Sequence, residues 1–111
     1  MKLNHYYVGY TQEEFLDIFY YDCVVHKYLE EAEVKVLQAI VNNCDETGYG
    51  VLDLESLSTV IKMNEDDLVG IINDKLLDKI LFGVSVLEIV EEKQLLGDTV
   101  YIIYSELAVC N

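Results

Sequence analysis

Carboxylates are the side chains of this sequence whose spacing most clearly suggests a binding chemistry. Residues 64–67 read Asn-Glu-Asp-Asp, and a second polar pair follows one helical repeat later, at positions that share a helical face with the first. Carboxylates repel phosphate and attract the side chains of lysine and arginine. The pattern therefore predicts an acidic surface for a protein partner with a basic surface. Its members are Glu65, Asp66, Asp67, Asn73 and Asp74.

A calcium site is the alternative reading of the carboxylates near the middle of the chain. Residues 45–56 resemble an EF-hand loop, which requires oxygen ligands at set positions, glycine at the sixth position and a bidentate glutamate at the twelfth. Asp45, Gly50, Leu52 and Asp53 fit, but the twelfth residue is Ser56. We therefore expect a turn that joins a helix to a strand, and we expect no metal and no cofactor.

Nucleophilic or acid–base catalysis finds little support in the residue types. The two histidines, His5 and His26, have no spacing to a serine or cysteine that would indicate an activated nucleophile. The cysteines form no CxxC pair and no metal-ligand pattern, so we interpret them as reduced, small apolar groups. The sequence favours a protein that is not an enzyme. The cysteines are Cys23, Cys44 and Cys110.

Tyrosine is the second residue type that could form a binding surface. The chain has nine tyrosines, and tyrosine is enriched at protein interfaces because it joins a large apolar ring to a polar tip. A second interpretation is that about half of them fill the edge of the core. We predict that the group near the start of the chain, Tyr6, Tyr7 and Tyr10, contacts a partner or a second copy in a homodimer.

The overall composition limits the classes of partner. The chain has 111 residues, which favours one domain over residues 1–111, and 52% of them are hydrophobic. Twenty-one acids stand against seven basic residues, all lysines, for a net charge of −14. Nucleic acid and anionic membrane are disfavoured by this charge. Without a signal peptide or an apolar run of the ~20 residues that span a bilayer, we expect a cytoplasmic protein.

The elements that must position these residues begin with an N-terminal arm and helix over residues 1–28. Residues 11–14 form a capping box in which Thr11 and Glu14 bond each other's backbone, so a helix should start there. The stretch 19–28 is rich in β-prone residues, and the sequence leaves open whether it is helix or strand. The predicted buried face of this helix contains Phe15, Ile18, Phe19 and Cys23.

Three further helices are predicted before the chain changes its periodicity. Residues 31–44 repeat apolar side chains at helical spacing, with Glu33 on the opposite, polar face. Asp53 should cap a short helix that buries Leu54, Leu57, Val60 and Ile61, and Asn64 should cap a helix that runs to Leu81. The buried stripe of this last helix is predicted to be Leu68, Ile71, Ile72, Leu76 and Ile80.

After Gly83 the apolar residues recur with a period of two, which indicates strands. Residues 84–89 and 100–104 surround a turn at Gly97 and Asp98, so they predict a β-hairpin. Val51 and Leu52 should pair with it as a short first strand. The predicted fold is α+β, a winged helix-turn-helix of three to four helices with a C-terminal hairpin wing, whose core spans residues 31–104.

Residues 23–108 resemble the N-terminal winged-helix domain of DnaD-type replication-initiation (primosome) proteins of low-GC Gram-positive bacteria and their phages. The resemblance lies in a pattern of hydrophobic residues that many winged helices share. The chain departs from the family at Ile80, where the family often has a glycine after the basic residue, and in its excess of acidic residues. The matching segments are residues 25–29, 31–37, 54–57, 63–69, 76–81 and 101–107.

The resemblance implies an oligomerisation and partner-docking module, with DNA binding in a separate C-terminal domain that we do not expect within these 111 residues. We therefore hypothesise a phage- or plasmid-derived interaction module that recruits or inhibits a replication or transcription protein, in one variant by imitating the phosphates of DNA. The alternative is a winged-helix transcriptional regulator that binds DNA as a dimer, using lysines near residues 62–79 and Lys93.

Overall fold

The computed structural model describes residues 10–90 and 100–109, and its first helix, α1 (Gln12–Val25), begins at the predicted capping box. The Thr11 hydroxyl accepts from the Glu14 backbone N–H at 3.2 Å, and the Glu14 carboxylate accepts from the Thr11 N–H at 3.2 Å. The β-prone residues from 19 to 25 are helical because Phe15, Phe19 and Cys23, four residues apart, bury one continuous stripe.

Helix α2 (Glu31–Asn42) buries the four apolar residues that its periodicity predicted, Val34, Leu37, Ile40 and Val41. The prediction for Glu33 was wrong, because this residue is only 8% exposed rather than on a solvated face. Its Oε1 accepts from the Glu30 backbone N–H at 3.1 Å, so the carboxylate bends back over the start of the helix.

Helices α3 (Leu54–Ile61) and α4 (Glu65–Ile71) are joined by a tight turn, and their predicted caps are confirmed. Asp53 Oδ1 accepts from the N–H of Glu55 at 3.1 Å. Asn64 Oδ1 accepts from the N–H of Asp66 at 2.7 Å, and α3 ends at Lys62 in the left-handed conformation, at φ 57°. Each helix is therefore bounded by interactions within its own few residues.

The prediction of one helix from residue 64 to 81 was wrong at its C-terminal end. Regular α-helix stops at Ile71, and a π-helical turn, η2 (Ile72–Leu76), closes with the Leu77 N–H donating to the Ile72 carbonyl at 2.9 Å. Asp78 then takes a left-handed conformation, at φ 60°, which ends the helical path. Leu68, Ile72 and Leu76 are fully buried, as predicted.

A small unpredicted hairpin, β2 (Ile80–Leu81) and β3 (Val84–Ser85), follows η2. Ile80 was predicted to be buried, but it lies on β2 and is 68% exposed. Phe82 and Gly83 make the turn, with φ values of 54° and 77°. Such values disfavour a bulky side chain, but the Phe82 ring packs edge-on between Phe19 and Tyr28, with ring centres 5.7 and 5.3 Å away.

The three-stranded sheet has the order β1-β5-β4, with β1 (Tyr49–Asp53), β4 (Glu88–Ile89) and β5 (Val100–Tyr104) all antiparallel to their neighbours. The pairing of Val51 and Leu52 with the last strand is confirmed, because Val51 lies opposite Ile102. β4 also pairs with β5 as predicted, with Glu88 opposite Tyr104. The predicted turn at residues 97–98 lies outside the described residues.

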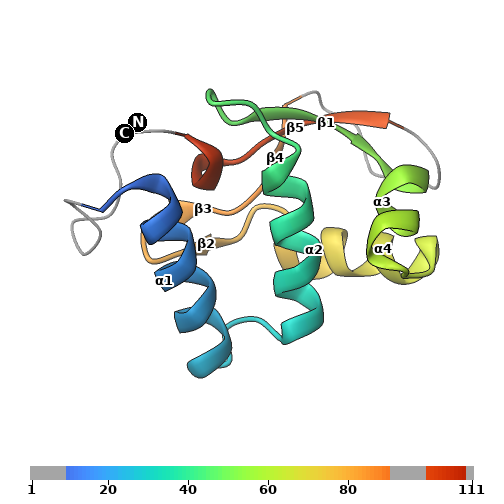
Figure 1. The fold of residues 1–111 in the computed structure, drawn as a ribbon. Helices are drawn as coiled ribbons and strands as arrows, with labels where there is room; N and C mark the ends of the chain where they lie inside the picture. The colour runs from blue at the N-terminus through green and yellow to red at the C-terminus, as the bar shows by residue number, and fades with distance from the viewer. Residues whose placement is uncertain (1–9, 91–99, 110–111) are drawn as a thin grey trace.

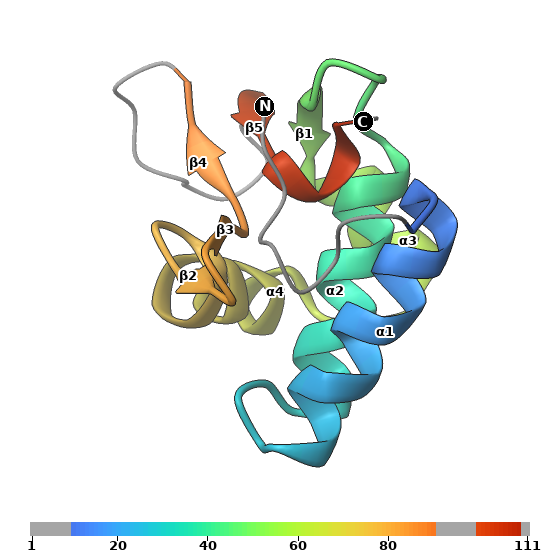
Figure 2. The ribbon, with the colours of Figure 1, turned by 90° about the vertical axis from the view of Figure 1, so that its left-hand side faces the viewer.

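The fold is α+β, with the helices on one side of the sheet (Figures 1 and 2). In Figure 1 the strands β1, β5 and β4 run along the top of the molecule, and the helices lie below them. A short 3-10 helix, η3 (Glu106–Ala108), follows β5 and buries Leu107. The inward side chains Leu52, Tyr101 and Ile103 join the helices in one core. Within residues 10–90 and 100–109 no helix is both long and apolar enough to cross a bilayer.

Candidate partner-binding surfaces

The acidic residues of α4 and η2 line a shallow groove of about 450 Å³, called here the acidic groove. Its carboxylates come from Asp66 and Asp67 in the first turn of α4 and from Asp74 in η2, which lies two turns further along the helical path. A Cβ atom added at Gly70 would meet no atom within 4 Å, so the centre of this face is open. The residues that line the acidic groove are Glu33, Met63, Asp66, Asp67, Gly70, Ile71, Asp74 and Lys75.

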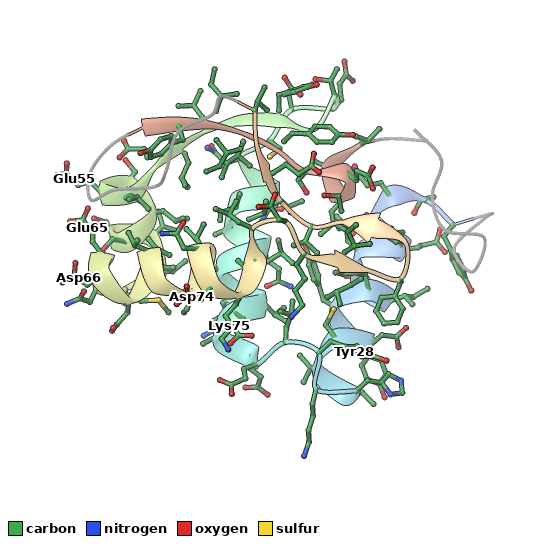
Figure 3. All side chains as sticks on the ribbon, turned by 180° about the vertical axis from the view of Figure 1, so that it is seen from behind. Tyr28, Glu55, Glu65, Asp66, Asp74 and Lys75 are labelled. Atoms are coloured by element: carbon green, nitrogen blue, oxygen red, sulfur yellow. The ribbon has the colours of Figure 1, made fainter. Side chains whose placement is uncertain are left out.

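The five predicted binding residues of this segment do not all lie in the acidic groove. Asp66, Asp67 and Asp74 do, whereas Glu65 and Asn73 are absent from its lining. Glu65 is half-buried, and its Oε1 has no hydrogen-bond partner among the described residues. Asn73 is exposed. Figure 3 places Glu65 and Asp66 at the outer end of α4, near Glu55 of α3, and Asp74 closer to the middle of the molecule.

Sequence reasoning missed Glu33 as a member of this surface, although it lines the groove from α2, with its Oε1 accepting from the Glu30 N–H. No sequence signal connects Glu33 with α4, because the contact depends on how the two helices cross. Lys75 is the one cation that lines the groove in the part of the chain described. The groove therefore combines several acidic side chains with the apolar side chains of Met63 and Ile71. This combination suits a cationic side chain with an aliphatic stem.

The tyrosines do not gather into a single surface. Tyr10 is exposed just before α1, whereas Tyr6 and Tyr7 lie outside the described residues. In both ribbon views α1 and α4 lie on opposite sides of α2, so Tyr10 does not extend the acidic groove (Figures 1 and 2). Tyr28, which follows α1, packs against Phe82 and is seen toward the bottom of the view in Figure 3. Part of the set does fill the core edge, since Tyr101 is buried.

The carboxylates of the EF-hand-like segment bond their own backbone. Asp45 Oδ1 accepts from the Thr47 N–H at 2.8 Å, from the Thr47 hydroxyl at 2.6 Å and from the Tyr49 N–H at 3.2 Å. These hydrogen bonds, led by the hydroxyl of Thr47, lower the pKa of Asp45. Asp53 caps α3. Over residues 10–90 and 100–109 no group of three His, Cys, Asp or Glu side chains is arranged to hold a metal ion.

Two cysteine thiols lie among packed side chains. Cys23 is fully buried on α1, and burial raises its pKa to about 12. Cys44, at the end of α2, is half-buried, and burial together with the charge of Asp45 raises its pKa to about 11. Both therefore remain protonated at neutral pH, which makes them poor nucleophiles. Cys110 lies outside the described residues.

His26 is exposed where α1 ends, and its ring centre is 5.8 Å from that of Tyr28.

A second groove, which the sequence did not predict, lies between α2, α3 and the edge of β1. Its volume is about 680 Å³, within the range of pockets that bind small ligands or single side chains. Val60 is 74% exposed beside it, whereas the sequence predicted that residue to be buried. Leu57 lines the groove from the same helix, so α3 places part of its apolar face on this surface rather than in the core.

No protein-family model, no curated protein and no solved structure matches this chain.

Proposed function

We propose that the chain is a winged-helix module that binds a protein partner rather than nucleic acid. The order of elements supports the winged-helix assignment: α2, β1, α3, α4, β4 and β5 follow one another as helix, strand, helix-turn-helix and two final strands. The sheet order β1-β5-β4 supports it as well, because the first strand pairs with the last one. In this arrangement α4 takes the place of the helix that enters the DNA groove in winged-helix DNA-binding proteins.

The acidic groove carries this proposal. Affinity for DNA rests on lysine and arginine contacts to phosphate, and α4 presents Asp66 and Asp67 where such contacts would be needed. Acidic residues in a first helical turn also stabilise the helix by interacting with its dipole, and this alone could account for Asp66 and Asp67. Asp74 has no such role, because it lies in η2 beyond the end of α4. It lines the same groove as Asp66 and Asp67, which favours a surface for a cationic partner.

The partner that this chemistry fits is a replication or transcription protein that exposes lysine or arginine around its own DNA-binding site. Carboxylates on α4 would occupy that site as phosphates do, which would inhibit the partner, or would hold it in a complex. The resemblance of residues 23–108 to DnaD-type domains supports a link with replication. The net charge of −14 supports fast association with a basic protein because opposite charges steer the encounter.

The test compares charge reversals at two places on the molecule. The double variant Asp66→Lys/Asp67→Lys should lose capture of basic, nucleic-acid-handling proteins from a bacterial lysate. The control, Glu13→Lys/Asp17→Lys, makes the same change of charge at exposed positions of α1. Equal capture by both variants, or capture of no basic partner by the wild-type chain, would contradict the proposal. Circular dichroism should confirm that both variants stay folded.

The DNA-binding regulator is the second candidate, and the helix-turn-helix arrangement of α3 and α4 is the observation that favours it. Such a regulator would need lysines beside α4, and Lys62 and Lys75 are exposed there. A gel shift at low salt decides between the two functions. Sequence-specific retardation of duplex DNA by the wild-type chain, abolished by Lys62→Glu/Lys75→Glu, would favour the regulator.

A further inference from the structure

The face of the three-stranded sheet that points away from the helices is apolar. Two rows of side chains cross it, one on each side of the pair Gly50 and Ile103. In the first row Tyr49 lies opposite Tyr104, with ring centres 5.0 Å apart, and Glu88 follows on β4. In the second row Val51 lies opposite Ile102, and the Val90 N–H donates to the Ile102 carbonyl at 3.2 Å. These six residues are called the outer sheet face.

An antiparallel sheet that faces water on one side normally alternates apolar and polar residues along each strand. β5 departs from this rule, because Tyr101 and Ile103 face the core while Ile102 is 37% exposed on the other side. Val51 and Val90 are exposed as well. Exposed apolar side chains from three neighbouring strands therefore lie on one face, and patches of this kind mark interaction sites on soluble proteins. Strands with apolar residues on both faces are typical of sheets that are covered on both faces.

The open edge of β1 offers less to a partner than the outer sheet face does. On the side away from β5, the Tyr49 carbonyl accepts from the Asp45 N–H at 2.8 Å, and the Val51 carbonyl accepts from the Asn43 side-chain amide at 2.8 Å. The turn before β1 therefore occupies two acceptors that an added strand would need. A partner would bind across the face through side chains.

The charges around the outer sheet face decide what kind of partner it fits. In the part of the chain that the structure describes, the strands and their flanking turns, residues 45–55, 86–90 and 100–106, contain six acids and no lysine or histidine, and by sequence the segment 91–99 between β4 and β5 adds three acids and Lys93. Burial and the charges of Glu106 and Glu88 raise the pKa of Tyr104, which is the direction that a negative local potential produces. A second copy of the chain would bring the same acids together. The acids of these segments are Asp45, Glu46, Asp53, Glu55, Glu88 and Glu106; Asp53 caps α3, and Glu106 Oε2 accepts from the Ser85 N–H at 2.7 Å, so Glu88 on β4 is the one that lies within the outer sheet face itself.

We propose that the outer sheet face is a second docking surface, and that it binds an amphipathic protein segment whose apolar stripe is flanked by lysine or arginine. The apolar stripe would cover Val51 and Ile102, and the basic flanks would meet Glu88 on β4 and Glu106 just beyond β5. This surface is separate from the acidic groove, since the sheet lies at the top of the molecule in Figure 1 and α4 lies below it. The proposal therefore does not depend on the function proposed for α4.

The probe is a short amphipathic peptide of leucine and lysine, titrated into the full chain at physiological salt while backbone amide shifts are followed by NMR. The same peptide with glutamate in place of lysine is the charge control. We expect the lysine peptide to shift the amide resonances of β1, β4 and β5. The shifts should be the same in the wild-type chain and in the Asp66→Lys/Asp67→Lys variant. The glutamate peptide should leave them unchanged.

Two valines of nearly equal exposure provide the matched variants. Val51 is 52% exposed on the outer sheet face, and Val25 is 51% exposed at the end of α1. Val51→Lys should weaken peptide binding by about tenfold or more, because it removes an apolar contact and repels the basic flank. Val25→Lys should change binding by less than about twofold. Val51→Thr, which keeps a β-branched side chain and adds no charge, should weaken binding by a smaller factor.

Three results would overturn the proposal. The first is an equal effect of Val51→Lys and Val25→Lys on binding. The second is a set of shifts confined to α4, which would assign the binding to the acidic groove alone. The third is self-association of the free chain in sedimentation equilibrium that Val51→Lys abolishes, because a second copy would then be the occupant of the outer sheet face.

Discussion

The acidic groove and the outer sheet face are both open to solvent, but their chemistry is opposite. The groove sets carboxylates from α4, η2 and α2 around a small apolar floor. The outer sheet face sets aromatic and β-branched side chains at its centre and keeps its acids at the margin. Both would attract a basic partner, the groove mainly by charge and the sheet mainly by apolar contact.

The difference shows why exposed charge and exposed apolar surface carry unequal weight as evidence. Acids at the start of α4 have a local explanation in the helix dipole, so only Asp74 and the contribution of Glu33 point beyond the helix itself. An exposed valine opposite an exposed isoleucine also supports its own sheet, because β-branched residues favour strands, but threonine would serve the strand in the same way and expose less apolar surface. The sheet therefore provides the stronger structural argument for a partner, although the sequence drew attention to α4.

The largest loss of stability is expected from substitutions at the residues that attach each region to the common core. Leu68 anchors α4 and Ile103 anchors β5, and both are almost fully buried. Leu68→Ala and Ile103→Ala should each lower the free energy of unfolding by about 2–5 kcal/mol, since each leaves a cavity. Urea titration measures this. If only one of the two variants lost less than about 1 kcal/mol of unfolding free energy, the region that carries it would not be packed on the same core as the other region.

Replacing one glycine in β1 and one in α4 by alanine should give the next largest changes in stability, and the two changes should have opposite signs. At Gly50 in β1 a Cβ would lie 3.0 Å from the Asn43 carbonyl oxygen and 3.1 Å from the Cys44 Cα, so Gly50→Ala should cost about 1–3 kcal/mol. At Gly70 in α4 the space is open, so Gly70→Ala should stabilise the fold by up to about 1 kcal/mol. Thermal melting of both variants measures the shifts, and a shift of the same sign in both would contradict this account.

The cap of α4 provides a smaller effect that tests how the acidic groove is held. Asn64→Ala removes the acceptor for the N–H groups of Asp66 and Asp67, so it should lower stability by about 1 kcal/mol. Asn64→Asp keeps an acceptor at that position and should retain most of the stability. Chemical unfolding measures the stability of both variants. Equal losses of stability in Asn64→Ala and Asn64→Asp would show that the cap does not hold this turn.

The smallest effect is pH-dependent and lies in the turn before β1. Because its hydrogen bonds lower the pKa of Asp45, the stability they contribute is present above the unfolded-state pKa of about 4 and is lost as pH falls through the lowered, folded-state pKa. Asp45→Asn does not titrate, so the advantage of the wild-type chain should narrow from pH 5 downward. Glu46→Gln removes the same charge but keeps the Asp45 acceptor, and it should follow the wild-type curve in urea titrations at each pH.

Much of the fold could be predicted because several boundaries are set within a few residues. Thr11, Asp53 and Asn64 each accept from the first turn of the helix that follows, and each was identified from its residue type and spacing. The pairing of Val51 with the last strand was also foreseen, because the period-two pattern left few other partners. Of the binding residues proposed from the sequence, Asp66, Asp67 and Asp74 do lie together on one surface.

The errors occur where distant segments compete with a local pattern. Ile80 continues the helical stripe of α4, but backbone pairing with Ser85 and the packing of Phe82 against Phe19 place it in a hairpin instead. Glu33 has the spacing of a solvated residue, but α2 carries it to the wall of the acidic groove. Val60 was assigned to the core from its spacing, yet α3 turns it toward the groove beside β1.

The sequence by itself determined the helix starts, the strand periodicity and the acidic character, because these depend on neighbouring residues and on total charge. Only the tertiary structure decided which side of each element meets another element. The packing of α2 against the later helices put Glu33 and Asp74 on the lining of one groove, and sheet pairing set Tyr49 beside Tyr104 and Val51 beside Ile102. Such contacts join residues that are far apart in the chain, so their position depends on how the whole core packs rather than on any local pattern.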